Sequence, residues 1–146
     1  MAEPKTPAAD VKDILVAGSH GTFAATSGWS LRVGGMNDQP DTQISITDTG
    51  GLFDNPKWRL EEPTFQVQVR AAPGDYESAY SKIYQVKDEL EGRGRSTESG
   101  TVYTGMIVTS PPTFIQWDEN NRPLFSMRLR AWREPSSTAS NRLPLS

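Results

Sequence analysis

Two segments of the chain repeat apolar residues at the three- and four-residue spacing of an amphipathic α-helix. The first segment opens with Thr6-Pro7, a capping hydroxyl followed by a proline at the first helical position. Its apolar stripe consists of Val11, Ile14 and Leu15. Gly18 is a suitable C-terminal stop, so we predict a helix over residues 7–18.

The second segment carries a longer apolar stripe and follows the turn sequence Pro73-Gly74-Asp75. The residues of this stripe are Tyr76, Ala79, Tyr80, Ile83, Val86 and Leu90. Charged residues fill the opposite side, and Gly92 ends the pattern. We predict a helix over residues 75–91 that packs this stripe on a sheet, with Tyr80 and Ile83 in the core.

Other segments alternate apolar and polar residues at the two-residue period of β-strands. They cover residues 29–33, 43–47, 65–70, 102–108, 114–117 and 124–132. The pattern is clearest in 65–70, where Phe65, Val67 and Val69 face one side. We predict that the first two strands form a hairpin through a loop at 37–41, and that the turn-rich stretch 50–56 is another loop.

The order of these elements predicts an α+β fold in which a mostly antiparallel β-sheet packs against two amphipathic α-helices. The chain has 146 residues, close to the usual size of one domain, so we expect a single domain over residues 1–146. Residues 1–6 are small and polar, and residues 135–146 are rich in Ser and Pro. We expect both ends to be flexible arms.

The composition removes several classes of function. Cysteine is absent and His20 is the one histidine, which excludes disulfides, thiolate nucleophiles and metal sites built from cysteine or histidine. A net charge of −3 gives no general attraction to nucleic acid or to an anionic membrane. The chain also lacks a signal-peptide pattern and a run of the about 20 apolar residues that cross a bilayer. We therefore expect no cofactor, no metal and no membrane partner.

The tripeptide Asp48-Thr49-Gly50 is the one that aspartic proteases place at their catalytic turn. In such an enzyme two carboxylates share a proton, so a chain of this length would have to dimerise. Here Gly51 stands where the small viral proteases have Ala or Ser, and no apolar-apolar-Gly segment stands out later. We interpret Asp48 as part of a turn at a strand end, and the chain as a protein without catalytic residues.

Arginines gather on the polar face of the predicted sheet. Arg128 and Arg130 alternate with apolar residues of the last strand, and Arg70 has the equivalent place beside Gln66 and Gln68. Two interpretations stay open: a solvated sheet face, or a charged contact with an acidic protein partner. Phosphate binding is less favoured because no aromatic residues interleave with the arginines.

Several motifs together resemble the phage minor capsid family related to tail terminators, the head–tail joining proteins of long-tailed phages. The motifs are Pro40-Asp41-Thr42, Asp48-Thr49-Gly50-Gly51, Asn55-Pro56-Lys57-Trp58, the stretch DENNRPLFS at 118–126, and Arg133-Glu134-Pro135. The likeness extends roughly from residue 10 to residue 143. It implies a tail-terminator-like α+β fold and a structural protein at the tail–neck junction of the virion, assembled in the host cytoplasm.

The resemblance also implies partners. Tail terminators form a ring, usually a hexamer, that caps the tail tube, stops its polymerisation and docks to the head connector or stopper protein, while genomic DNA passes through the bore without sequence-specific binding. A ring of identical subunits needs two different contact surfaces on each subunit. The candidate contact residues are Asp48, Gly50, Gly51, Asn55, Pro56, Trp58, Arg70, Arg122, Arg128 and Arg130. The open alternatives are a head-completion or stopper protein of a neighbouring neck ring, a DNA binder and, remotely, an aspartic protease.

Overall fold

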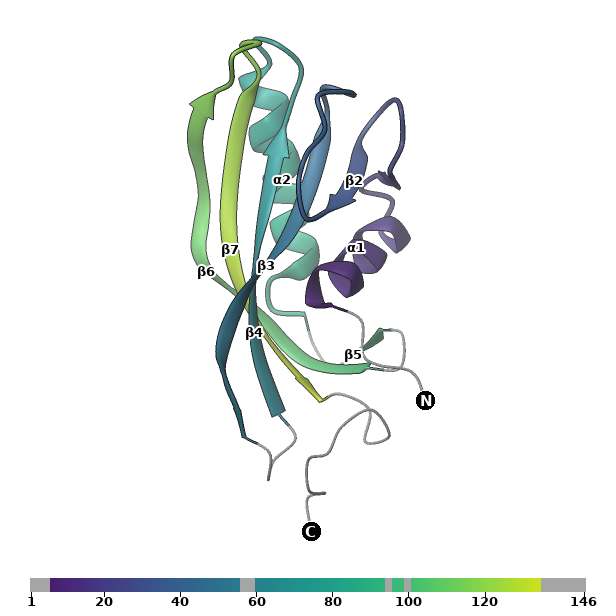
Figure 1. The fold of residues 1–146 in the computed structure, drawn as a ribbon, viewed down its shortest axis with the longest axis vertical. Helices are drawn as coiled ribbons and strands as arrows, with labels where there is room; N and C mark the ends of the chain where they lie inside the picture. The colour runs from purple at the N-terminus through teal and green to yellow at the C-terminus, as the bar shows by residue number, and fades with distance from the viewer. Residues whose placement is uncertain (1–5, 56–59, 94–95, 99–100, 135–146) are drawn as a thin grey trace.

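The computed structural model describes residues 6–55, 60–93, 96–98 and 101–134, and Figure 1 shows one twisted sheet with both helices on the same side of it. The strands are β1 (Thr22–Phe23), β2 (Ser30–Val33), β3 (Gln43–Asn55), β4 (Leu60–Arg70), β5 (Ser96–Glu98), β6 (Thr101–Trp117) and β7 (Pro123–Glu134). Their order in the sheet is β1-β2-β3-β4-β7-β6-β5. The β1–β2 and β2–β3 pairs are parallel and the other pairs are antiparallel. The predicted α+β class with a mostly antiparallel sheet is confirmed.

Both predicted helices are present and begin at the caps that the sequence indicates. In α1 (Pro7–Ala17) the Thr6 side chain accepts a hydrogen bond of 3.1 Å from the Ala9 N–H. In α2 (Tyr76–Leu90) the Asp75 carboxylate accepts one of 3.2 Å from the Ser78 N–H. Each bond satisfies an N–H group that the first helical turn leaves without an intrahelical partner.

The core lies between the two helices and one face of the sheet. Phe65, Val67 and Val69 of β4 are fully buried, as their alternation predicts. On α2 the buried residues are Ala79, Ile83, Val86 and Leu90. Tyr80, predicted to be in the core, is 42% exposed. This half of α2 lies over β7 and the outer strand β6, and Tyr80 makes ring contacts with Tyr84 and Phe125 at the flank of the core.

The predicted hairpin between the first two alternating strands is wrong. Strands β2 and β3 are parallel, with Ser30 opposite Gln43 and Val33 opposite Ile46. The chain must therefore return along the length of β2 between them, and residues 34–42 make that return. The sequence pattern gives the two strands but not their relative direction, because polar loop residues suit either connection.

One further loop prediction is wrong, and two predicted strands form one strand, because strands continue through bulges. Strand β3 runs through the stretch expected to be a loop, with a register shift between Asp48 and Gly50. Gly50 has a φ of +98° there, a conformation that favours glycine. Strand β6 unites the two predicted strands 102–108 and 114–117, and its register shifts between Ser110 and Thr113, on either side of two prolines. The short strands β1 and β5 were not predicted.

The arms expected at residues 1–6 and 135–146 lie outside the described residues, apart from Thr6, which caps α1.

Candidate functional site

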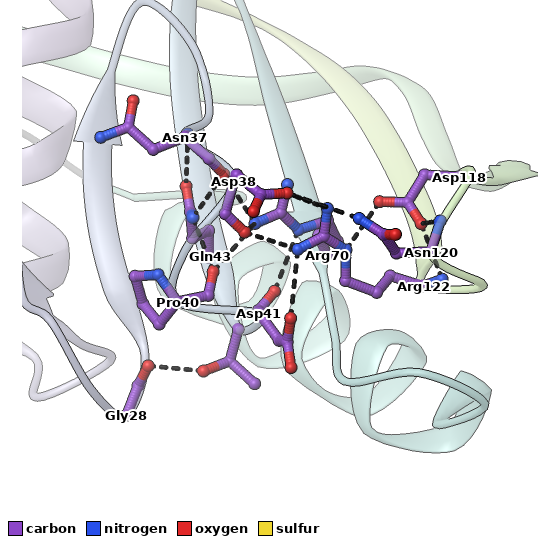
Figure 2. A network of polar contacts seen from close by, with 11 residues as sticks. Gly28, Asn37, Asp38, Pro40, Asp41, Gln43, Arg70, Asp118, Asn120 and Arg122 are labelled. Carbon is purple, nitrogen blue, oxygen red and sulfur yellow. Dashed lines mark hydrogen bonds and ion pairs between the residues drawn. The ribbon is translucent and has the colours of Figure 1, made fainter.

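Arg70 is buried under the connection between β2 and β3. It is 6% exposed, and its guanidinium donates to the backbone carbonyls of Asn37, Asp38, Pro40 and Asp41 at 2.8–3.1 Å. Figure 2 shows this cluster, in which the Gln43 side chain also bonds the loop. Gln43 and Arg70 point away from the helix side, since their neighbours Ile44 and Val69 are in the core. The loop therefore crosses the sheet face opposite the helices.

Arg122 ties the same loop to the turn between β6 and β7. It is 4% exposed and pairs with Asp118 at 2.7 Å, Asp41 at 3.1 Å and Asp38 at 3.2 Å. Burial opposes the charged form of Asp118, but hydrogen bonds from the backbone and side chain of Arg122 outweigh it and lower the pKa of Asp118. Burial also opposes the charged form of Arg122 and would lower its pKa, but its hydrogen bonds to these carboxylates raise that pKa. For Arg70, burial and the nearby charge of Arg122 lower the pKa.

Of the five residues predicted to share a polar face, the register places all five on the side opposite the helices. Gln66 lies opposite Arg128, Gln68 opposite Ser126 and Arg70 opposite Leu124, while Thr64 lies opposite Arg130. Arg128 is exposed and Arg130 is half-buried, whereas Arg70 and Arg122 are enclosed by loops of the chain itself. Among the candidate arginines, Arg128 is thus exposed and Arg130 partly so, although its Nε is buried.

A second buried charge cluster, which sequence reasoning missed, joins α1 to the sheet. Asp10 of α1 is fully buried and accepts a hydrogen bond of 2.6 Å from the Tyr103 hydroxyl. Arg133 lies 3.9 Å from the Asp10 carboxylate, 3.5 Å from the Tyr103 hydroxyl and 2.7 Å from Glu61. Burial, followed by the bond to Asp10, raises the pKa of Tyr103. Arg133 follows Phe125, Met127, Leu129 and Ala131 at every second position of β7, and this alternation is the one feature of the sequence that indicates its burial.

Asp48, the residue of the protease-like tripeptide, lies inside β3 rather than in a turn. Its carboxylate accepts a hydrogen bond of 3.0 Å from the Ala8 N–H in the first turn of α1. The next residue, Thr49, is bonded through its hydroxyl to Thr64 of β4 at 2.8 Å. The expected turn is therefore wrong, and the tripeptide instead joins the helix N-terminus to a bulge in the sheet.

Replacing Asp48 by Ala should destabilise the fold by about 0.5–2 kcal/mol, the usual effect of removing an acceptor from a helix N-terminus. Asp48→Asn keeps an acceptor oxygen and should therefore lose less free energy of unfolding than Asp48→Ala. Urea unfolding monitored by circular dichroism measures both variants. Equal stability of Asp48→Ala and the unaltered chain would show that the contact with Ala8 contributes nothing.

The remaining candidate residues belong to the β3–β4 hairpin. Gly51 pairs with Pro63 and Asn55 pairs with Leu60, while Pro56 and Trp58 lie outside the described residues. Figure 1 shows that this end of the hairpin projects past both helices. The hairpin is thus a backbone feature that extends from the body of the protein, available to meet another molecule.

Exposed large apolar side chains gather at the two lateral edges of the described sheet. One group lies beside β1 and β2 and consists of Val16, Phe23 and Val33. The other consists of Tyr76 and Tyr80 of α2 with Ile115 and Trp117 near the end of β6. Ile107 of β6 is also exposed, but it lies opposite Arg130, on the sheet face away from the helices. Sequence periodicity could not find either group, because it assigns a residue to a face and not to an edge.

The described residues include no group of three or more metal-ligating side chains placed to hold an ion, and no described helix is long and apolar enough to cross a membrane. The exposed features of the described residues are a polar sheet face, a projecting hairpin and two groups of apolar side chains. These features define a small α+β protein whose exposed features suit contact with other proteins.

Comparison with known proteins agrees with that class. A family model described as bacteriophage tail terminator protein matches residues 11–134. The chain belongs to the bacteriophage tail terminator family, as its motifs suggested, and is therefore a structural protein of a phage tail or neck.

Solved structures support the fold alone. A chain from the virion of a native gene transfer agent particle is 14% identical, with a TM-score of 0.60, and the match covers 89% of this chain and 99% of that one. A second solved chain is 12% identical with a TM-score of 0.43 over 69% of this chain and 77% of that one, too weak a likeness to support an argument. No curated protein matches the sequence significantly.

Proposed function

We propose that the protein forms a closed ring, expected to be a hexamer, on the last ring of the tail tube, where it ends polymerisation and presents the surface that docks to the head connector. Membership of the tail terminator family supports this role. The structural observation that carries it is the division of exposed apolar side chains between two opposite edges of the sheet. A subunit with two different contact surfaces associates head to tail. Such contacts close into a ring when the rotation from one subunit to the next brings the last subunit back to the first.

The partners under this proposal are other copies of the chain, the tail tube protein and a connector or stopper protein. The site of action is the tail–neck junction of the virion, after assembly in the host cytoplasm. DNA passes through the bore without sequence-specific contact, which suits a chain of net charge −3 because phosphates would be repelled more than held. No catalytic step belongs to this role.

Native mass spectrometry of the purified protein, alone and with isolated tail tubes, tests the function. We expect a discrete ring that binds the open end of tubes, and tails of uniform length when the protein is present during tube assembly. If the ring does not bind tubes and binds only DNA-filled heads, the protein is a stopper. A protein that stays monomeric with tubes, while tube length is uncontrolled, would contradict the proposal.

The exposed arginines should contribute to contact with an acidic partner. Arg128→Glu reverses a solvent-facing charge without disturbing the buried clusters, so the fold should keep its melting temperature. If the open sheet face meets the tube or a neighbouring subunit, the reversal should slow tail capping, because like charges placed opposite each other are unfavourable. Electron microscopy of tails assembled with this variant measures capping, and Arg128→Lys, which keeps the positive charge at the same position, is the matched control. Capping at the unaltered rate would show that this face is merely solvated.

A further inference from the structure

Phe23 at the β1 edge and Phe114 on β6 lie at the same level across the sheet. Strand register gives one continuous row in which Phe23 lies opposite Leu31, Leu31 opposite Ile44, Ile44 opposite Val69, Val69 opposite Phe125, and Phe125 opposite Phe114. The row begins at Phe23 on the β1 edge and ends at Phe114 on the β6 edge. Phe23 is 52% exposed, so the row leaves an aromatic ring open at its first end.

The other end of the row is a shelf of aromatic rings. Phe114 lies 5.3 Å from Tyr76 and 5.6 Å from Trp117 between ring centroids, and Tyr76 lies 6.1 Å from Trp117. Tyr76, Tyr80 and Trp117 are 37%, 42% and 43% exposed. Rigid aromatic side chains that are packed on one side and open on the other are the residue types that anchor protein interfaces.

We propose that the ring contact joins the edge carrying Phe23 on one copy of the chain to the aromatic shelf of Tyr76, Tyr80 and Trp117 on the next copy. This inference rests on the proposed ring. Neighbours in a closed ring are related by rotation without translation along the axis, so contacting surfaces must have equal height along that axis. A row that crosses the sheet from edge to edge satisfies this condition when the strands run roughly parallel to the ring axis.

Side chains rather than backbone pairing form this contact. Among the described strands, β6 pairs with β5 only over residues 101–103, which leaves most of its outer edge open. Pro111 and Pro112 lie in that open stretch, and proline cannot donate a ladder hydrogen bond. On the opposite edge β1 has two residues, too few for a stable ladder with a neighbour. The contact therefore depends on the apolar rings, supported by Lys12, whose ammonium lies 4.5 Å from the Phe23 ring centroid.

Cysteine crosslinking tests the proposal directly, because the chain contains no cysteine. A double variant, Phe23→Cys with Trp117→Cys, should yield a ladder of covalent species with a short bis-maleimide, ending at the mass of the native ring. Each single variant should give no species above a dimer. The matched control is Phe23→Cys with Arg128→Cys, which moves the second thiol to the middle of the open sheet face and should give no ladder.

Charge insertion provides the second measurement. Phe23→Asp should weaken subunit association by about tenfold or more, as expected for loss of an aromatic anchor, with an unchanged circular dichroism spectrum. Should this variant fold poorly, the cysteine variants still decide the question. Intact rings of Phe23→Asp together with an absent ladder would overturn the edge contact and leave the ring itself standing. If the unaltered chain forms no ring even on tail tubes, both the proposed function and this inference are wrong.

Discussion

Replacing Arg133 by Met should lower the free energy of unfolding by about 3–5 kcal/mol, the range found when one member of a buried ion pair is removed. The Arg133 guanidinium faces the fully buried carboxylate of Asp10 and bonds Glu61 at 2.7 Å. Methionine fills a similar volume but supplies no positive charge, so two carboxylates lose a cation in a region from which water is largely excluded. Urea unfolding at neutral pH measures the loss.

A double-mutant cycle with Asp10→Asn separates the charge effect from packing. If the two charges stabilise each other, the double variant should lose less free energy of unfolding than the sum of the losses of the two single variants. Arg128→Met serves as the control, because Arg128 is an exposed arginine of the same strand and should change stability by less than about 0.5 kcal/mol. Equal losses for Arg133→Met and Arg128→Met would contradict a structural role for the buried cluster.

Replacing Ile83 by Ala should lower stability by about 2–5 kcal/mol, since the side chain is fully buried in the stripe of α2 and the substitution leaves a cavity. Tyr80→Ala is the comparison within the same helix. Tyr80 is 42% exposed, so its loss should be clearly smaller, and it should instead affect subunit association through the aromatic shelf. Denaturant melts and native mass spectrometry measure the two effects. A loss below about 0.5 kcal/mol for Ile83→Ala would place this residue outside the core.

The local elements of this protein could be predicted from the sequence because their signals are local. The hydroxyl of Thr6 and the carboxylate of Asp75 bond the helix N-termini that follow them, and the alternation in β4 matches its buried side. The parallel direction of β2 and β3 could not be predicted, because it depends on the path that residues 34–42 take between them. That path is decided by Arg70 and Arg122, which come from distant parts of the chain.

The candidate contact residues were predicted less well for a similar reason. Alternation assigned Arg70 to a polar face correctly, but a polar face can be covered by a loop of the same chain, and Arg70 is covered in this way. Arg122 precedes a strand, where no periodic signal indicates burial. Trp58 lies outside the described residues, so its predicted role stays a prediction. The family motifs identified the class of protein although they did not indicate which side chains are exposed.

Arg70 and Arg122 tie two surface loops together, which lowers the cost of ordering these loops when a partner binds. Residues 34–42 and the turn at 118–122 contain few apolar groups, and loops of this kind ordinarily lose conformational freedom when a partner covers them. Here buried guanidinium groups already hold both loops in place in the free protein (Figure 2). A partner that docks on this end of the molecule would meet a preorganised surface and would gain affinity because little ordering remains to be done.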